Sequence, residues 1–105
     1  MALLDDIRDK IARRRYEFSK HAVDQTIIRN ISVAELEQAL TDRCEVIEDY
    51  PDDKYGPSCL VLGFTGAGRA LHVQCSHATR PLIKIITVYE PDAELWINLR
   101  IRRKP

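Results

Sequence analysis

The chain has 105 residues, and a chain of this length folds around a single core, so we expect one domain over residues 1–105. Hydrophobic residues make up 45% of the sequence and charged residues 30%, a balance that excludes a disordered polypeptide. Sixteen basic and sixteen acidic residues cancel, so the chain lacks the strong positive charge of many nucleic-acid-binding proteins.

The charges are distributed unevenly along the sequence. Residues 35–53 contain eight acidic residues and one basic residue, whereas the last six residues, RIRRKP, contain four basic residues. A second basic cluster, RRR, occupies residues 13–15. Two interpretations stay open: the charged runs are solvated surface, or they bind partners, the basic runs a polyanion and the acidic segment a basic protein or a second copy of the chain.

The cysteines and the N-terminus indicate the compartment. Cys44, Cys59 and Cys75 lie singly in apolar segments without a CxxC motif, which favours reduced, buried thiols. The N-terminus MALLDDIRDK lacks the basic and then apolar pattern of a signal peptide, and the sequence contains no apolar run of membrane-spanning length. We therefore expect a cytoplasmic protein that does not interact with a membrane.

Helical signals dominate the first part of the chain. Apolar residues recur at spacings of three and four within residues 1–15, which predicts an N-terminal helix. Ser19 is placed as the N-cap of a second helix. Ser32 and Glu35 form a capping-box pattern that starts a third, whose expected buried stripe consists of Val33, Leu36 and Leu40.

Strand signals follow from residue 43 onward. The segments CEVIEDY, SCLVLGF, RALHVQCS and LIKIITVY are separated by short loops, which predicts an antiparallel meander of four strands. Strict alternation over residues 95–101 predicts a fifth strand, although Asp92 could first begin a short helical turn. Alternation also places His72 on a polar face that we expect to be exposed to solvent.

These elements predict an α+β fold, with two to three N-terminal helices packed on one face of a four- to five-stranded antiparallel meander sheet. The same sequence contains one group of potential metal ligands in HVQCSH, namely His72, Cys75 and His77. A strand turns His72 away from Cys75, and no second cluster completes four ligands. We expect neither a metal nor a cofactor.

Two groups of polar residues are candidates for a functional site. Lys20 and His21 follow Ser19 at a helix N-terminus, where free backbone N–H groups favour an anion, and Arg29 lies about two turns further along. The polar sheet face holds the second group, with Lys84 and Tyr89 on the strand next to His72, and Trp96 and Arg100 together on the last strand. The alternatives are an ordinary solvated helix face and a packed tryptophan.

Three motifs in this order resemble a family of uncharacterised bacterial domains: S-x-H-A in SKHA, R-x-I-S in RNIS, and I-x-T-V-Y-x-P in IITVYEP. The likeness covers residues 16–96 and leaves out the first helix and the basic strand end or tail, residues 97–105. This family is similar in turn to the RelE/ParE and BrnT toxins, small α+β proteins in which helices precede an antiparallel sheet. Several of those toxins cleave mRNA, with or without the ribosome, and are neutralised by an antitoxin.

The resemblance implies a toxin-like domain that acts on RNA, as a metal-independent endoribonuclease of a toxin-antitoxin pair. A histidine with a near-neutral pKa can move protons to and from a ribose 2′-hydroxyl, arginines can stabilise phosphorane charge, and aromatic rings can stack on bases. The catalytic candidates are His21, His72, Arg29 and Tyr89, and the RNA-binding candidates are Trp96, Arg100, Lys84 and Lys20.

Two other classes of function stay open. The chain could be a non-catalytic protein-interaction module, in which the acidic segment 35–53 binds a basic partner or forms a homodimer. It could also be a small-ligand-binding domain, with a pocket between the second helix and the sheet.

Overall fold

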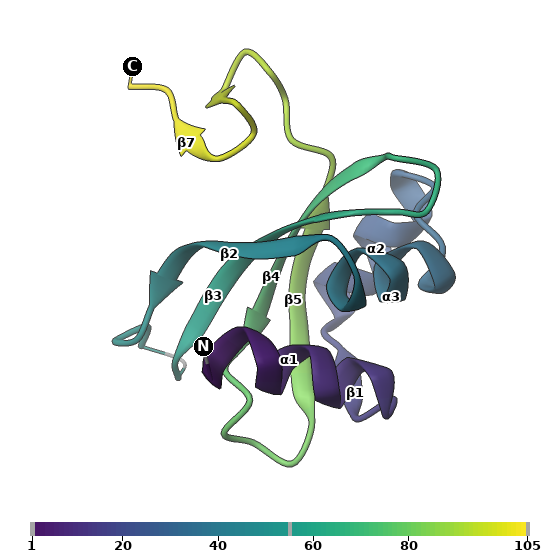
Figure 1. The fold of residues 1–105 in the computed structure, drawn as a ribbon, viewed down its shortest axis with the longest axis vertical. Coiled ribbons are helices and arrows are strands. Elements are labelled where there is room, and N and C mark those ends of the chain that lie inside the picture. Colours follow the sequence, from purple (N-terminus) through teal and green to yellow (C-terminus); the bar gives the residue numbers. More distant parts are fainter. Residues whose placement is uncertain (1, 55, 105) are drawn as a thin grey trace.

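The computed structural model describes residues 2–54 and 56–104, and in these residues the chain forms three helices, a five-stranded sheet and a two-stranded hairpin (Figure 1). The predicted α+β class is confirmed. The elements are α1 (Ala2–Ala12), β1 (Tyr16–Phe18), α2 (Lys20–Ile28), α3 (Val33–Thr41), β2 (Cys44–Tyr50), β3 (Ser58–Phe64), β4 (Ala70–Ser76), β5 (Ile83–Tyr89), β6 (Trp96–Ile97) and β7 (Ile101–Arg102).

The sheet has the strand order β1-β5-β4-β3-β2. Strands β2 to β5 form the predicted antiparallel meander, with Val61 opposite Val73 and Val73 opposite Val88. The prediction of a wholly antiparallel sheet was wrong, because β1 pairs in parallel with β5, from Tyr16 opposite Ile83. A strand of three residues is too short for alternation to reveal it.

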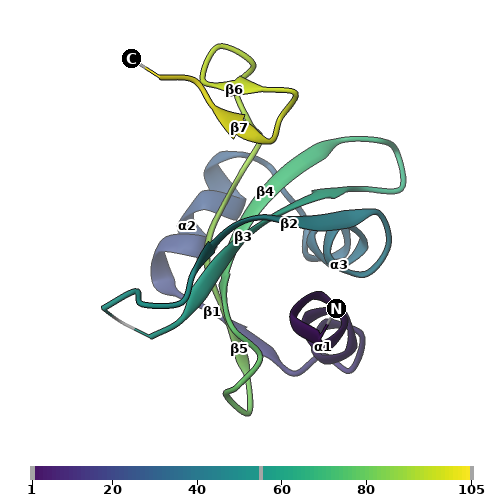
Figure 2. The same cartoon turned by 60° about the vertical axis from the view of Figure 1, so that its left-hand side comes forward.

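The main core lies between the sheet and the helices α1 and α3, which Figure 2 shows together on one side of the sheet. Helix α2 packs against β5. Cys59 and Cys75, which oppose each other on β3 and β4, are fully buried as predicted, whereas Cys44 is only partly buried, so its predicted burial was wrong. The largest side chains of this core are Ile7, Ile11, Leu36, Leu40, Leu71, Val61, Val73, Ile83, Ile85 and Val88.

Helix α3 lies very close to strand β3 at Gly63. A Cβ added to Gly63 would lie 1.9 Å from the backbone oxygen of Ala39, so only glycine permits this approach. The buried side of α3 consists of Leu36, Ala39 and Leu40, whereas Val33 is 53% exposed, so its predicted place in the buried stripe was wrong. The position after the N-cap faces solvent here.

The predicted caps explain where the helices begin. The Ser19 hydroxyl accepts a hydrogen bond from the Ala22 amide at 3.0 Å, and Ser32 and Glu35 form the complete capping box. Helix α1 ends at Ala12, three residues before the predicted end, and Arg14 beyond it has a φ of 59°. In residues 2–54 and 56–104, every helix is too short or too polar to cross a lipid bilayer.

The fifth meander strand predicted over residues 95–101 is not formed. A helical turn comes first, in which the Trp96 amide donates to the Asp92 carbonyl at 3.1 Å. This confirms the alternative prediction that a helical turn begins at Asp92. The chain then forms β6, a turn at Asn98 and Leu99, and β7, a separate two-stranded sheet. This C-terminal hairpin, residues 91–104, lies at the top of Figure 1, away from α1.

Candidate functional site

His72 lies on β4, on the sheet face opposite α1 and α3, and it is fully buried. The prediction that this position is exposed to solvent was wrong, because the C-terminal hairpin covers it. The Trp96 ring is perpendicular to the imidazole at a centroid distance of 4.4 Å, and the Tyr89 ring lies 5.2 Å from it. Trp96 itself is only 4% exposed.

Both ring nitrogens of His72 have partners. Nε2 lies 2.6 Å from the Leu99 carbonyl oxygen, which can only accept, so Nε2 carries the proton in the neutral ring. Nδ1 then accepts from the Tyr89 hydroxyl at 3.1 Å. Burial lowers the pKa of His72 below its ordinary value, and the Leu99 carbonyl and the Glu48 carboxylate oppose this shift. The ring is therefore held as a neutral imidazole.

The turn of the hairpin positions the Leu99 carbonyl next to His72. Asn98 and Leu99 have φ values of 52° and 64°, and the Arg100 amide donates to the Ile97 carbonyl at 3.0 Å, as in a type I′ turn. A leucine in the left-handed region costs about 1 kcal/mol. The contact between the Leu99 carbonyl and His72 offsets this strain.

Arginines attach the hairpin to the acidic edge strand β2. Arg102 forms a bidentate ion pair with Glu48, with Nε–Oε2 at 2.9 Å and Nη2–Oε1 at 3.1 Å, and its guanidinium stacks 4.7 Å from the centre of the Trp96 ring. Arg100 pairs with Glu45, and the Tyr50 hydroxyl donates to Glu48. Burial would raise the pKa of Glu48, but the bonds from Arg102 and Tyr50 outweigh it and lower that pKa.

The sequence presents the acidic segment and the basic C-terminus as two separate charged surfaces, but Arg100 and Arg102 pair with Glu45 and Glu48 within one chain. The two residues of the Arg102–Glu48 pair are 54 positions apart in the sequence. His77 is likewise bonded to Asp49, at 2.6 Å. These pairs leave the acidic segment less available to an outside partner than the sequence suggests.

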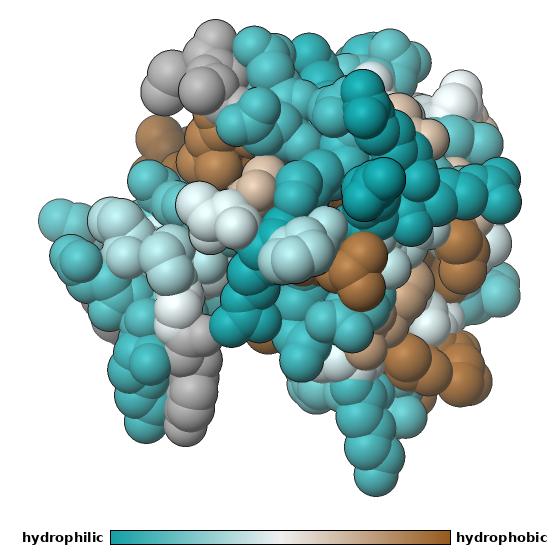
Figure 3. Space-filling view, turned by 90° about the horizontal axis from the view of Figure 1, so that it is seen from below, coloured by the Kyte–Doolittle hydropathy of each residue, from teal (hydrophilic) through white to brown (hydrophobic). Residues whose placement is uncertain are grey.

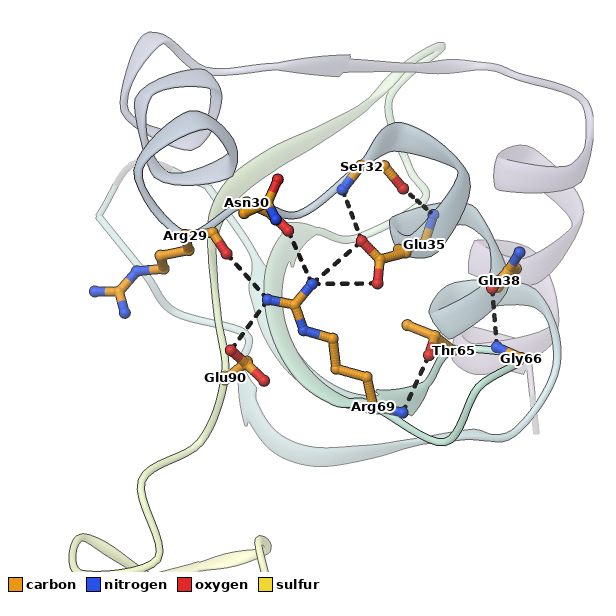
Figure 4. Close-up of polar contacts among 9 residues, drawn as sticks. All are labelled: Arg29, Asn30, Ser32, Glu35, Gln38, Thr65, Gly66, Arg69 and Glu90. Carbon is orange, nitrogen blue, oxygen red and sulfur yellow. Dashed lines mark hydrogen bonds and ion pairs between the residues drawn. The ribbon is translucent and has the colours of Figure 1, made fainter.

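A second arginine, Arg69, joins four elements of the fold (Figure 4). Its guanidinium donates to both carboxylate oxygens of Glu35 at 3.2 Å and to Glu90 at 3.0 Å. It also donates to the backbone carbonyls of Arg29 and Asn30 at the end of α2, at 3.0 and 2.9 Å. The hydrogen bond from Arg69 lowers the pKa of Glu90, and bonds from the Ser32 amide and from Arg69 lower that of Glu35.

Local sequence patterns contain little indication of this Arg69 centre. The only local signal is an arginine directly after the tight turn TGAG, while its partners lie between 21 and 40 positions away. The predicted site residue Arg29 contributes its backbone carbonyl here, and its side chain points away from Arg69 in Figure 4. The network closes the end of α2, as a C-cap does, and fastens it to α3, β4 and β5.

The structure brings some predicted site residues together and separates others. His72, Tyr89 and Trp96 form one ring cluster, whereas the Arg29 guanidinium donates to the Gln25 side chain. Lys20 and His21 are exposed at the start of α2, where no described contact links them to His72. Arg100 forms an ion pair with Glu45, although the sequence placed it next to Trp96 as a residue available to bind RNA.

Lys84, the remaining candidate, lines a cavity of about 420 Å³ between the N-terminal end of α2 and the sheet. Among the described residues, the cavity is lined by Ser19, Asp53, Gly56, Pro57, Gln74, Ser76, Arg80, Lys84 and Ile86. The sequence suggested a small-ligand pocket between the second helix and the sheet, whereas α2 borders this cavity only through its N-cap Ser19 among the described residues. No group of three or more His, Cys, Asp or Glu residues with metal-binding geometry occurs in the described parts of the chain.

Comparison with protein families identifies the family of the matched region. The model of a domain of unknown function, DUF4258, matches residues 18–90, from the end of β1 to the carboxyl end of β5. Helix α1 and the C-terminal hairpin lie outside the matched region. Comparison with curated proteins and comparison with solved structures found no match.

Proposed function

The chain belongs to the DUF4258 family, and we propose that it is a non-catalytic interaction module whose polar sheet face binds an arginine- and tryptophan-bearing protein segment. The binding surface consists of His72 together with Glu45, Glu48 and Tyr50 of the acidic strand β2. In the free chain, its own C-terminal hairpin occupies this surface.

The main observation behind the proposal is how the hairpin binds to this surface. A bidentate guanidinium on Glu48 and an indole ring over His72 are the contacts that recognise arginine and tryptophan at protein interfaces. The surface belongs to the matched region, residues 18–90, whereas its occupant lies outside that region. The hairpin has strands of only two residues, so its own backbone pairing is weak and its attachment depends on the Trp96 and arginine contacts.

A labelled peptide with the sequence of residues 91–104 tests this proposal by fluorescence anisotropy. In the wild-type chain the tethered hairpin competes at an effective concentration of about 1 mM, so peptide binding should be weak. In the full chain with Arg102→Ala the competitor is weakened, and we expect peptide affinity to rise up to about fivefold.

Two controls make the result specific. A peptide in which glutamine replaces Arg100 and Arg102 should not bind, and adding Glu48→Gln to the Arg102→Ala chain should remove binding. If neither chain binds the wild-type peptide, the face does not accept such a segment in trans, and the proposal fails.

A second candidate function, cleavage of RNA, is favoured by the contact of His72 with the Tyr89 hydroxyl. These two groups could act as proton donor and proton acceptor. Because His72 is buried and both of its nitrogens are bonded, RNA could reach it only after the hairpin has moved. RNA or a ribosome would then be the substrate partner, and a cognate antitoxin the inhibitor.

A translating bacterial extract tests this candidate. The chain with Trp96→Ala and Arg102→Ala should generate RNA ends with 2′,3′-cyclic phosphate, and adding His72→Ala or His21→Ala should show which histidine is needed. Intact RNA in the presence of the folded, hairpin-opened chain would leave the interaction module as the function.

A further inference from the structure

The cavity beside α2 lies at the opposite end of β4 and β5 from the hairpin. Ser76 ends β4 and Lys84 follows the first residue of β5, whereas His72 and Tyr89 lie towards the other ends of these strands. Figure 3 views the molecule from below, the end from which the β4–β5 loop projects in Figure 1, and its surface is mainly hydrophilic with separate apolar patches. The cavity is therefore separate from the surface of the proposed interaction.

The charges in this cavity do not cancel. Arg80 and Lys84 line it, and within residues 2–54 and 56–104 neither side chain makes an ion pair or a hydrogen bond. The acidic residue on the wall, Asp53, accepts a hydrogen bond from the Ser58 hydroxyl at 3.0 Å. Elsewhere Arg69, Arg100 and Arg102 are paired with carboxylates, so two unpaired cations on one wall set this cavity apart.

The remaining wall offers hydrogen bonds and a small apolar surface. The Ser76 hydroxyl accepts from the Lys84 amide at 2.9 Å, which leaves its own proton free to donate. The Gln74 side chain is half-buried beside it, and Ile86 and Pro57 supply apolar contact. A volume of about 420 Å³ lies in the range of small-molecule sites.

From this arrangement we propose that the cavity binds a small organic phosphate, of the size of a nucleoside monophosphate. The planar guanidinium of Arg80 and the ammonium of Lys84 match a dianionic group with three terminal oxygens better than a carboxylate with one charge and two oxygens. Ser76 donates to the same group, and Asp53 accepts from a hydroxyl of the attached sugar. Ile86 and Pro57 contact the remainder of the ligand.

Calorimetric titration of the full chain tests the proposal, with adenosine monophosphate, inorganic phosphate, acetate and adenosine as probes. We expect adenosine monophosphate to bind with a Kd below about 1 mM, phosphate more weakly, and acetate and adenosine not at all. Arg80→Ala and Lys84→Gln should each weaken binding about tenfold, because each removes one charge-assisted contact. Arg13→Ala on an exposed face of α1 should leave the affinity within about a factor of two.

Arg80 is exposed in a loop, so Arg80→Ala keeps the test valid even if Lys84→Gln destabilises the sheet. Backbone NMR shifts should map to Gln74, Ser76 and Lys84, and the Trp96 signal should not move. Absence of binding at about 10 mM, acetate binding as tightly as phosphate, or affinity unchanged in Arg80→Ala would each overturn the proposal. None of these outcomes depends on the hairpin.

Discussion

Arg69 and Arg102 use the same chemistry for different purposes. Each forms hydrogen bonds with carboxylates, but the side chain of Arg69 is 23% exposed and bonds to groups on α2, α3 and β5, whereas that of Arg102 is 62% exposed and holds only the hairpin. Every element that Arg69 joins lies in the family-matched region, and Arg102 lies outside it. Arg69 therefore connects elements within the domain, whereas Arg102 holds the hairpin against the surface of the domain.

This difference separates global from local stability. Loss of a partly buried arginine leaves carboxylates and backbone carbonyls without partners inside the fold. Loss of an exposed one leaves Glu48 next to water, where solvent replaces the lost bonds. The two arginines can be told apart by whether the whole domain or only the hairpin responds.

The largest effect should follow from Arg69→Ala. Glu35, Glu90 and the carbonyls at the end of α2 would lose their common donor, and we expect the free energy of unfolding to fall by about 3 kcal/mol. Urea denaturation followed by circular dichroism measures this change. Arg13→Ala, which removes an exposed i,i+4 pair with Asp9, should cost less than about 0.5 kcal/mol. Equal effects for the two variants would contradict a central role for Arg69.

Arg102→Ala should act on the hairpin and leave the rest of the domain almost unchanged. The loss of an exposed ion pair is worth about 1 kcal/mol, which corresponds to about a fivefold rise in the open population of the hairpin. The amide of Arg103, bonded to the Leu95 carbonyl at 2.9 Å, should then exchange its hydrogen about five times faster in NMR experiments. The amides of β3 serve as the internal control, and faster exchange there would mean that the hairpin is part of the global folding unit.

The sequence predicted the elements whose signals are local. Serine caps predicted the starts of α2 and α3, and strand-like segments separated by short loops predicted the four meander strands. It failed where a distant segment decides the environment. Alternation correctly turned His72 away from the main core, but only the fold shows that Trp96, 24 positions later, covers it. Over residues 95–101 the alternation of apolar and polar residues is typical of a strand. In the structure, Asn98 and Leu99 have positive φ values and form a turn that reverses the chain.

The candidate site was also predictable only where local strand patterns place its residues. Tyr89 was assigned to the polar face from strand neighbours, and it does contact His72. Arg69 could not be found, because its partners come from three other elements that only the tertiary fold brings together. The charged segments were the hardest part of the sequence to interpret, because their ion pairs within the chain depend on where the C-terminal hairpin lies in the fold.

Acid should open the hairpin to a smaller extent than Arg102→Ala. The buried His72 has a pKa below its ordinary value of 6.5, so the open state takes up a proton first as pH falls. The stabilising contribution of neutral His72 is fully present above pH 6.5 and is lost as pH falls from 6.5 through the lower folded pKa. The lowered pKa of Glu48 adds a second loss below its ordinary value of 4.5.

Trp96 is the only tryptophan in the sequence, so its fluorescence measures this opening directly. Between pH 7 and pH 5 the emission should shift to longer wavelength and acrylamide quenching should increase. His72→Gln keeps one donor and one acceptor at this position and should flatten the response above pH 5. An unchanged pH profile in that variant would assign the titration to another group.

The smallest effect on stability should come from His21→Ala. His21 is exposed near the start of α2, and Ser19 alone provides the cap, so we expect a change within about 0.5 kcal/mol in urea denaturation. Ser19→Ala is the matched control, because its hydroxyl accepts from the Ala22 amide and donates to the Ile86 carbonyl, and it should cost about 1 kcal/mol or more. A larger loss for His21→Ala than for Ser19→Ala would show a structural role for the histidine, and a negligible loss would leave function as the reason to examine it in the RNA assay.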